Sequence, residues 1–398
     1  MATRKKSAAP SDIHAFVESR REDLVGYLSA LVRAQTFNPP GEEHRAAEVV
    51  AVFCKREGIP FETFAKEPGR TNLVARVGTG RPRVFIPVHF DTVPAGEGWT
   101  TDPFEPVVKN GRLYGRGAMD NKGPMAAMML VARYLKAREA KLKGQLVLAG
   151  VADEEAGSRL GVQYLLDEVG LEAELSIVPD AGHEMRIIDI GEKGLLHFKV
   201  IAIGRQAHGS RPELGVSALW GMVDLLNRLR GWRPPTTGPS AIFTPPTMNV
   251  GAIHAGSVPN VVPGRCECIF DIRYHPGTTE EDILGHVRKE MALVEASAPG
   301  LRMSIEVLSS LGPTLVPPDN PLIELLERHT EAVAGYKPRR EGESGTTVAK
   351  QIIAKGIPAV GFSCGPAEIA HQADEYIELD DLARFAEVMA RALVELLT

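Results

Sequence analysis

The sequence predicts an α/β protein: a three-layer domain with a mainly parallel sheet, into which a ferredoxin-like domain of βαββαβ order is inserted. Apolar runs typical of strands alternate with helical periodicity up to about residue 190, and this alternation resumes after residue 309. Between these positions the order changes to strand, helix, strand, strand, helix, strand. We therefore expect one discontinuous domain, residues 1–190 and 310–398, interrupted by an independent domain of residues 191–309.

Each element of the first part follows from the spacing of its apolar residues. Leu24, Leu28 and Leu31 recur at helical spacing, and the Pro39-Pro40-Gly41 run ends this helix region. The run Val84–Val88 is apolar throughout, as in a strand that is buried on both faces. The same reasoning predicts helices over residues 11–34, 46–57 and 123–140, and strands over residues 72–77, 83–88, 145–152 and 176–180.

The inserted and final parts are interpreted in the same way. Leu196, Phe198 and Val200 alternate with polar residues, as in a half-buried strand. In the insertion we expect strands over residues 196–202, 248–253, 265–273 and 302–308, and helices over residues 218–229 and 279–296. After it we expect helices over residues 321–334 and 380–397, a strand over 358–363, and a further helix after residue 347.

The composition indicates an ordinary globular protein whose partners are small molecules. Lys and Arg number 45 against 51 Asp and Glu, so the formal charge of −6 offers no electrostatic basis for binding nucleic acid or an anionic membrane. No apolar run approaches the roughly 18 residues of a membrane span, and the basic N-terminus lacks a signal-peptide core. We therefore expect a cytoplasmic protein. Its four scattered cysteines predict no disulfide framework, and Cys266 and Cys268 alternate as core residues do.

One polar motif follows the apolar strand that ends at Val88. His89 comes first, and Asp91 follows two residues later. Residues two apart in a strand share a face, so the Asp91 carboxylate can hydrogen-bond one ring nitrogen of His89 and leave the other for a metal. Alone, such a pair is more typical of a solvated turn. Four further segments favour the metal interpretation.

Three of these segments place acids at the end of a strand or the start of a helix. Asp120 stands in the glycine-rich segment Gly115–Gly123, where the backbone can bend to aim its carboxylate, although Asp120 could instead cap the next helix. The three acids of Asp153–Glu155 end an apolar strand and repel one another unless a cation or proton relieves them; the alternative is a solvated loop. Asp180 ends another strand.

The fourth segment supplies a second histidine, His371, in a loop of the final part. With His89 and the acids it makes a set of two histidines and three or four carboxylates that can converge on one edge of the sheet. Nitrogen and oxygen ligands without thiolates suit zinc in an open, catalytic site, with Co²⁺ or Mn²⁺ able to substitute. If two metal ions bind, one carboxylate must bridge them.

In this order, the five motifs resemble those of the dinuclear-zinc amidohydrolases, which include acetylornithine deacetylase, succinyl-diaminopimelate desuccinylase, aminoacylase, carboxypeptidase G and several dipeptidases. The resemblance covers nearly the whole chain; it implies that the larger domain is catalytic and the insertion a lid and dimerisation domain. It also implies two zinc ions per subunit and a cis peptide bond after Asp120. The implied roles are His89 and Asp180 as ligands of one zinc, Glu155 and His371 as ligands of the other, Asp120 as the bridge, Asp91 as the residue that orients His89, and Glu154 as the general base.

Five more residues resemble the substrate-binding residues of this family. His208 would reach the active site of the partner subunit and stabilise an oxyanion, although a lone histidine in such a loop is more often a surface residue. Asn260 and Arg273 resemble lid residues that contact substrate, and the guanidinium of Arg273 suits a bidentate grip on a carboxylate. Gly345 and Thr346 could bind that carboxylate through main-chain amides; the alternative is an ordinary glycine-rich turn.

Together, these expectations describe a zinc-dependent hydrolase that cuts an amide next to a free carboxylate. The leading hypothesis is a deacylase of N-acyl amino acids resembling acetylornithine deacetylase; the alternative is a dipeptidase or carboxypeptidase. Asp180, where some members carry glutamate, favours the deacetylase and the dipeptidases over the desuccinylase. A non-catalytic zinc-binding relative is less favoured, because neither Glu154 nor any expected ligand is replaced. By resemblance we also expect a homodimer formed through the lid domain, acting on a small N-acyl amino acid or short peptide.

Overall fold

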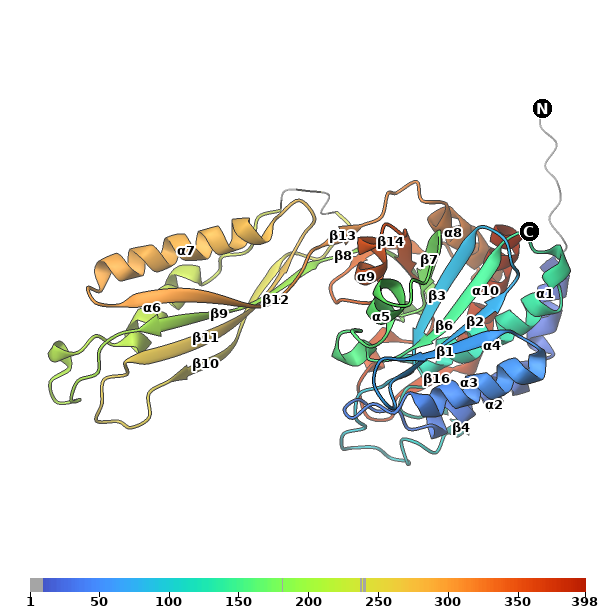
Figure 1. The fold of residues 1–398 in the computed structure, drawn as a ribbon, viewed down its shortest axis with the longest axis horizontal. Helices are drawn as coiled ribbons and strands as arrows, with labels where there is room; N and C mark the ends of the chain where they lie inside the picture. The colour runs from blue at the N-terminus through green and yellow to red at the C-terminus, as the bar shows by residue number, and fades with distance from the viewer. Residues whose placement is uncertain (1–9, 181, 237, 239–240) are drawn as a thin grey trace. The chain divides into compact units, whose positions relative to one another are not determined.

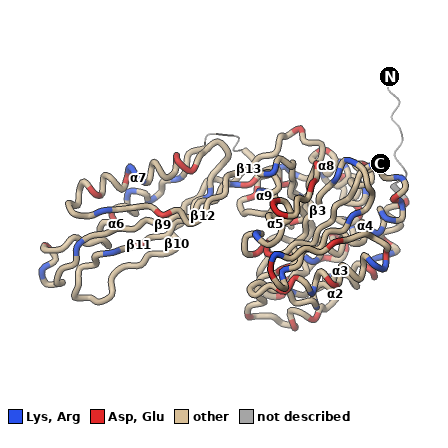
Figure 2. Tube along the Cα trace, in the orientation of Figure 1, with Lys and Arg blue, Asp and Glu red and all other residues tan. Residues whose placement is uncertain are grey.

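The computed structural model describes residues 10–180, 182–236, 238 and 241–398. Within these residues, none of the helices combines the length and the apolar character that a membrane span requires. Lys and Arg alternate with Asp and Glu along the chain trace, without a long stretch of one sign (Figure 2).

The chain is divided into two compact units. The first runs to Ile190 and resumes with Val316–Glu341 and Thr347–Thr398. The second comprises Gly191–Leu315 and Gly342–Thr346. The second unit therefore begins at the residue where the inserted domain is expected to begin. It extends past residue 309, the expected end of the inserted domain, because the strand that includes residue 309 continues to residue 311.

The large sheet has a parallel centre and antiparallel edges (Figure 1). Strands β6, β3, β7 and β15 run parallel to one another, and the strands on either side of them are antiparallel. The predicted α/β class with a mainly parallel central sheet is confirmed. The order is β1-β2-β6-β3-β7-β15-β8-β13, with β14 also paired to β8. The strands are β1 Phe61–Ala65, β2 Thr71–Val77, β3 Arg83–His89, β6 Gln145–Val151, β7 Leu175–Val178, β8 Ile187–Glu192, β13 Thr314–Leu315, β14 Arg339–Glu343 and β15 Ala359–Gly361.

Helices cover both faces of this sheet, which makes the three layers. On one face, residues of α5 and α9 pack with Val74, Phe85 and Val147 of the central strands. On the other, α4 contacts β2, β3 and β6 and is itself covered by α2 and α10. The helices are α1 Pro10–Glu18, α2 Arg21–Arg33, α3 His44–Glu57, α4 Lys122–Lys136, α5 Val162–Asp167, α8 Pro321–Ala334, α9 Ala349–Ala354 and α10 Leu379–Leu397.

The single helix predicted over residues 11–34 is wrong in one respect, because it is two helices, α1 and α2. Arg20 separates them with φ −124°, outside the helical range. Ser19 donates its hydroxyl to the Phe16 carbonyl at 2.8 Å, and such a local bond competes with continuation of the helix. Apolar spacing runs through this point unchanged, so periodicity alone could not locate the break.

The first unit also contains a small antiparallel sheet, which was not predicted. It has the order β16-β5-β4 and joins residues more than 260 positions apart, since Tyr376 pairs with Tyr114. Strands of three residues are too short for a periodicity to identify. The strands are β4 Val107–Lys109, β5 Arg112–Tyr114 and β16 Tyr376–Glu378.

The second unit has the predicted ferredoxin-like order β9-α6-β10-β11-α7-β12. Its four strands form an antiparallel sheet in the order β10-β11-β9-β12, with both helices packed into its apolar core. Cys266 and Cys268 are buried in that core, as their alternation predicts. The elements are β9 Gly194–Ile203, α6 Ala218–Leu229, β10 Thr247–Ala255, β11 Arg265–Tyr274, α7 Glu280–Ser297 and β12 Arg302–Leu311.

Candidate metal centre and active site

Acidic and histidine side chains of the first unit meet at the carboxyl ends of its parallel strands. His89 is the last residue of β3, Glu154–Glu155 follow β6 in a short 3₁₀ turn, and Asp180 lies just beyond β7. Because β3 runs between β6 and β7, these side chains share one edge of the sheet. Asp120 joins them from the loop before α4, and His371 from the loop before β16.

Asp120 lies between the two histidines. Its Oδ1 is 2.9 Å from Nε2 of His89, and its Oδ2 is 3.3 Å from Nε2 of His371. The same His371 nitrogen is 3.3 Å from Oε2 of Glu155. One carboxylate thus contacts both imidazoles through different oxygens, which is the arrangement that a bridging ligand requires.

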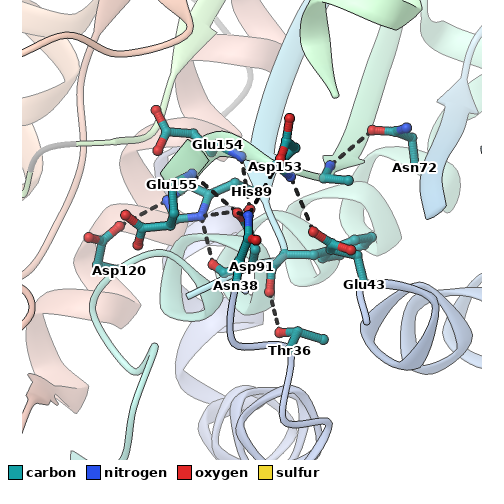
Figure 3. Close-up of polar contacts among 12 residues, drawn as sticks. Thr36, Asn38, Glu43, Asn72, His89, Asp91, Asp120, Asp153, Glu154 and Glu155 are labelled. Atoms are coloured by element: carbon teal, nitrogen blue, oxygen red, sulfur yellow. Dashed lines mark hydrogen bonds and ion pairs between the residues drawn. The ribbon is translucent and has the colours of Figure 1, made fainter. Parts of the chain in front are cut away.

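Two groups of potential ligands share His89. Ligand atoms of His89, Asp120 and Glu155 lie within 4.8 Å of one another, and so do those of His89, Glu154 and Asp180. Figure 3 shows the Glu155 carboxylate pointing toward Asp120, whereas the Glu154 carboxylate points away from it. Adjacent glutamates therefore face different parts of one cluster, so they can take different roles.

Contacts with the two histidines favour the charged form of the Asp120 carboxylate. Burial alone would raise the pKa of Asp120, but the hydrogen bonds from His371 and His89 keep it well below the ordinary range. Burial opposes the charged form of His89, yet the contact with Asp120 raises the pKa of this imidazole well above its usual value. Hydrogen bonds to Asp120 and Glu155 raise the pKa of His371 to about 10.

Glu154 and Glu155 also differ in what surrounds them. Burial and the negative charge of Asp180 raise the pKa of Glu154 well above that of an ordinary glutamate. In the described part of the chain, Oε1 of Glu155 is buried and has no hydrogen-bond partner. A buried acceptor of this kind is uncommon, and a cation would supply the missing interaction. The nitrogen and oxygen donors of this cluster therefore fit divalent ions such as zinc.

The structure corrects the contact expected of Asp91. Nδ1 of His89 is bound at 2.8 Å by the main-chain carbonyl of Asp91, whereas the Asp91 carboxylate lies 3.7 Å from this nitrogen. That carboxylate instead accepts the main-chain N–H groups of Glu154 and Glu155, both at 3.1 Å (Figure 3). The spacing of the two residues could not show whether the carboxylate or the main-chain carbonyl of Asp91 binds His89, because both place an oxygen of Asp91 near this histidine.

A buried network, which the sequence does not indicate, supports the same acidic segment. Arg70 donates to both oxygens of Glu43, at 2.8 and 2.7 Å, and to Oδ1 of Asp153 at 3.0 Å. Asn38 donates to the Asp91 carboxylate at 3.0 Å. The partners are 27, 83 and 53 residues apart, so no local pattern contains the network. Arg70 thus pairs with two of the buried carboxylates, and neutral N–H donors satisfy the third, that of Asp91.

The loop that carries Asp120 has the expected cis peptide bond between Asp120 and Asn121. It is also held by Glu375, to which the sequence gives no role. This carboxylate accepts the main-chain N–H of Asp120 at 3.1 Å. The sequence could have drawn attention to Glu375, because this residue lies only four positions after His371, one of the expected ligands.

The three expected substrate residues of the second unit lie at two ends of its sheet. His208 forms a bridge with Val261, and the Asn260 carbonyl accepts the N–H of the residue after His208 at 2.7 Å, so His208 and Asn260 are neighbours. Both are exposed. Arg273 lies at the opposite end of β11 and donates to Asp271 at 2.9 Å. The structure therefore does not bring Arg273 together with the other two.

Gly345 and Thr346 both belong to the segment 342–346 of the second unit. The N–H of Gly345 donates to Oε1 of Glu343 at 2.8 Å, so a carboxylate of the same loop already engages this amide. Oγ1 of Thr346 is buried without a hydrogen-bond partner in the described residues. A substrate carboxylate would have to displace Glu343 to use the Gly345 amide.

Comparisons with known proteins show similarity to metal-dependent hydrolases over nearly the whole chain. The chain is 32% identical to an uncharacterized metallohydrolase of Methanocaldococcus jannaschii, covering 94% of this chain and 99% of that protein. It is 29% identical to succinyl-diaminopimelate desuccinylase of Methylobacterium radiotolerans, covering 96% and 98%. Its fold matches a Bacillus subtilis protein described as a dinuclear metal binding peptidase, with a TM-score of 0.70, 15% identity, and coverage of 95% and 99%.

The family resemblance drawn from the five motifs is confirmed by a match to a whole-family sequence profile. The match covers residues 85–395, a range that contains every residue of the metal cluster, the whole second unit and most of the first. The chain therefore belongs to peptidase family M20/M25/M40, a family of metal-dependent hydrolases.

Proposed function

We propose that this chain removes the acyl group from N-acyl amino acids by hydrolysis, using two zinc ions per subunit. The observation that carries the proposal is the position of Asp120, within hydrogen-bond distance of His89 and close to His371 on its other oxygen. A carboxylate placed in this way between two imidazoles suits a pair of metal ions better than a single one.

Five side chains would hold the two ions. We assign His89 and Asp180 to one ion, Glu155 and His371 to the other, and Asp120 to both. Bound zinc supplies Lewis acidity, which makes water acidic enough to lose a proton near pH 7 and polarises an amide carbonyl.

Glu154 is the residue that we propose to move protons in the reaction. Its carboxylate is partly buried, lies within 4.8 Å of ligand atoms of His89 and Asp180, and points away from Asp120. It would take a proton from the attacking water and pass it to the leaving amine, so that one group serves as base and then as acid. The Asp91 carboxylate accepts the main-chain N–H groups of Glu154 and Glu155, which fixes the backbone from which both side chains project.

The second unit would supply the contacts that recognise substrate. Arg273 lies at the end of β11 that pairs with Leu195, and Arg265, near Asn260, lies at the other end. At about 3.4 Å per residue these ends of the strand are separated by about 27 Å, which exceeds the length of an N-acyl amino acid. One substrate cannot touch both Arg273 and His208 of the same chain. This separation supports a homodimer in which each chain offers His208 to its partner.

Complementation between two inactive variants tests this dimer. If His208 acts in the other subunit, Glu154→Ala and His208→Ala chains, each inactive alone, should recover about a quarter of wild-type activity when co-expressed, because half of the dimers carry one intact site. Each variant co-expressed with a second copy of itself is the control. Absence of recovery, or full activity in a monomeric wild-type protein, would remove this role of His208.

Hydrolysis of a substrate panel by zinc-loaded protein tests the proposed activity. The panel contains N-acetyl-ornithine, other N-acetyl amino acids, N-succinyl-diaminopimelate and unmodified dipeptides, and chelator-treated protein is the control. We expect hydrolysis to be concentrated on the N-acetyl amino acids, to disappear with chelator and to return with zinc. Cleavage of dipeptides in preference to acyl amino acids would contradict the deacylase, and so would cleavage that survives removal of the metal.

A further inference from the structure

A fully buried ion pair joins the loops around one half of the proposed metal centre. The side chains of Arg116 and Glu375 are 1% and 0% exposed, and Nη1 of Arg116 donates to Oε2 of Glu375 at 2.6 Å. The two residues are 259 positions apart in sequence. Removing two charges from water is unfavourable unless further hydrogen bonds compensate, so the remaining contacts of this pair indicate its role.

Glu375 directs both of its oxygens at the main chain of the loop that carries Asp120. Oε2 accepts the N–H of Gly117 at 3.0 Å. Oε1 accepts the N–H of Met119 at 2.9 Å and that of Asp120 at 3.1 Å. Three amides of one short loop therefore point at a single carboxylate, which fixes the backbone from which the proposed bridging ligand projects.

Arg116 connects this loop to two others. Its Nη2 donates to the main-chain carbonyl of Ala95 at 3.0 Å and to that of His371 at 3.3 Å. The guanidinium also lies over the ring of Trp99, 5.2 Å from its centroid. His371 has a positive φ of 64°, a conformation that is sterically unfavourable for a residue other than glycine, so its backbone needs contacts of this kind.

The small sheet places Glu375 where it can make these contacts. Tyr376 pairs with Tyr114, and the N–H of Gly115 donates to the Glu375 carbonyl at 2.9 Å, so the pairing of β16 with β5 continues up to the ion pair. The side chain of Glu375 therefore reaches the Asp120 loop from the start of β16, where pairing with β5 fixes the Glu375 backbone.

We propose that Arg116 and Glu375 are positioning residues that hold Asp120 and His371 in their metal-binding arrangement before any metal is present. This inference rests on the proposed metal centre and deepens it, since it assigns the preorganisation of the Asp120–His371 half to one buried pair. Apart from the contacts of Arg116 with Ala95 and Trp99, the side-chain contacts of the pair go to the two loops that carry these ligands, which an ion pair that only stabilised the fold would not require.

Hydrogen exchange of the wild-type, metal-free protein is the first test. If Glu375 holds the loop without metal, the amides of Gly117, Met119 and Asp120 should exchange slowly in metal-free protein, at nearly the same rates as in zinc-loaded protein. Exchange at the rate of an unstructured loop, with protection appearing only when zinc is added, would overturn the proposal. This measurement needs no variant, so it decides the question even if a substitution prevents folding.

Metal titration of Arg116→Lys is the second test. Lysine keeps the positive charge but cannot contact Glu375, Ala95 and His371 at once. We expect the dissociation constant of the zinc ion assigned to Glu155 and His371 to rise about 10- to 100-fold, and that of the other ion, which shares Asp120, to rise less. In a His371→Ala background, where this half is already lost, Arg116→Lys should have little further effect on zinc binding.

Arg340→Lys is a matched control. Arg340 likewise joins a carboxylate to a main-chain carbonyl, donating to Glu327 at 2.6 and 2.9 Å and to Pro318 at 3.2 Å. It should lower the midpoint of thermal unfolding without altering either zinc dissociation constant. Two wild-type dissociation constants in Arg116→Lys would overturn this inference alone, whereas wild-type protein that binds no zinc would overturn the proposed function itself.

Discussion

Glu154→Ala protein should bind two zinc ions, as the wild type does, and hydrolyse its substrate about 10³-fold more slowly. The carboxylate of Glu154 is partly buried beside the cluster and points away from Asp120, so removing it should leave the other ligands in place. The reaction would lose the group that accepts a proton from water and returns it to the amine. Metal content per chain and kcat, measured on the same preparation, check this result.

Glu155→Ala is the control that separates the two adjacent glutamates. Oε2 of Glu155 lies 3.3 Å from Nε2 of His371, and its other oxygen is buried without a partner in the described chain. We expect this variant to lose zinc from the His371 half and to lose activity for that reason. Loss of zinc from Glu154→Ala, or full zinc content in both variants with full activity, would show that the roles are wrongly assigned.

Asp120→Asn should have the largest effect on metal binding of any single substitution in the cluster. Of the described residues, Asp120 is the one whose side chain contacts both His89 and His371. A carboxamide offers one neutral oxygen in place of two charged ones and turns an NH₂ group toward one imidazole. We expect less than one zinc per chain at concentrations that saturate the wild type, and activity no higher than that of chelator-treated protein.

Asp167→Asn serves as the reference for this variant. Asp167 pairs with Lys355 at 2.6 Å and lies outside the cluster, so its substitution should change neither zinc content nor activity. The metal-free Asp120→Asn chain should remain folded, because His89 and His371 can become neutral once the carboxylate charge is gone. Two zinc ions bound with wild-type affinity in Asp120→Asn would exclude a bridging role.

The elements that sequence reasoning located well are those that are long and periodic. Strand β3, helix α8 and helix α10 lie within a residue or two of their expected ranges, and the βαββαβ order of the second unit is as predicted. Elements of three residues, such as β5 and β16, were missed, and so was the break at Arg20. Short strands contain less than one full repeat of the polar–apolar pattern, and their pairing is decided by residues far away in the chain.

The sequence by itself determined which side chains stand at the carboxyl ends of the central strands. A strand's apolar run and the polar residues that end it occupy one short window, and parallel strands bring their ends to one edge, so the meeting of His89, Glu154 and Asp180 was predictable. Only the tertiary structure decided how these side chains are held. The Asp91 carboxylate binds the amides of Glu154 and Glu155, and Glu375 binds those of the Asp120 loop. Such contacts join side chains to main-chain groups of distant segments, and since every residue except proline carries the same main-chain N–H, no pattern of residue types reveals which one is bound.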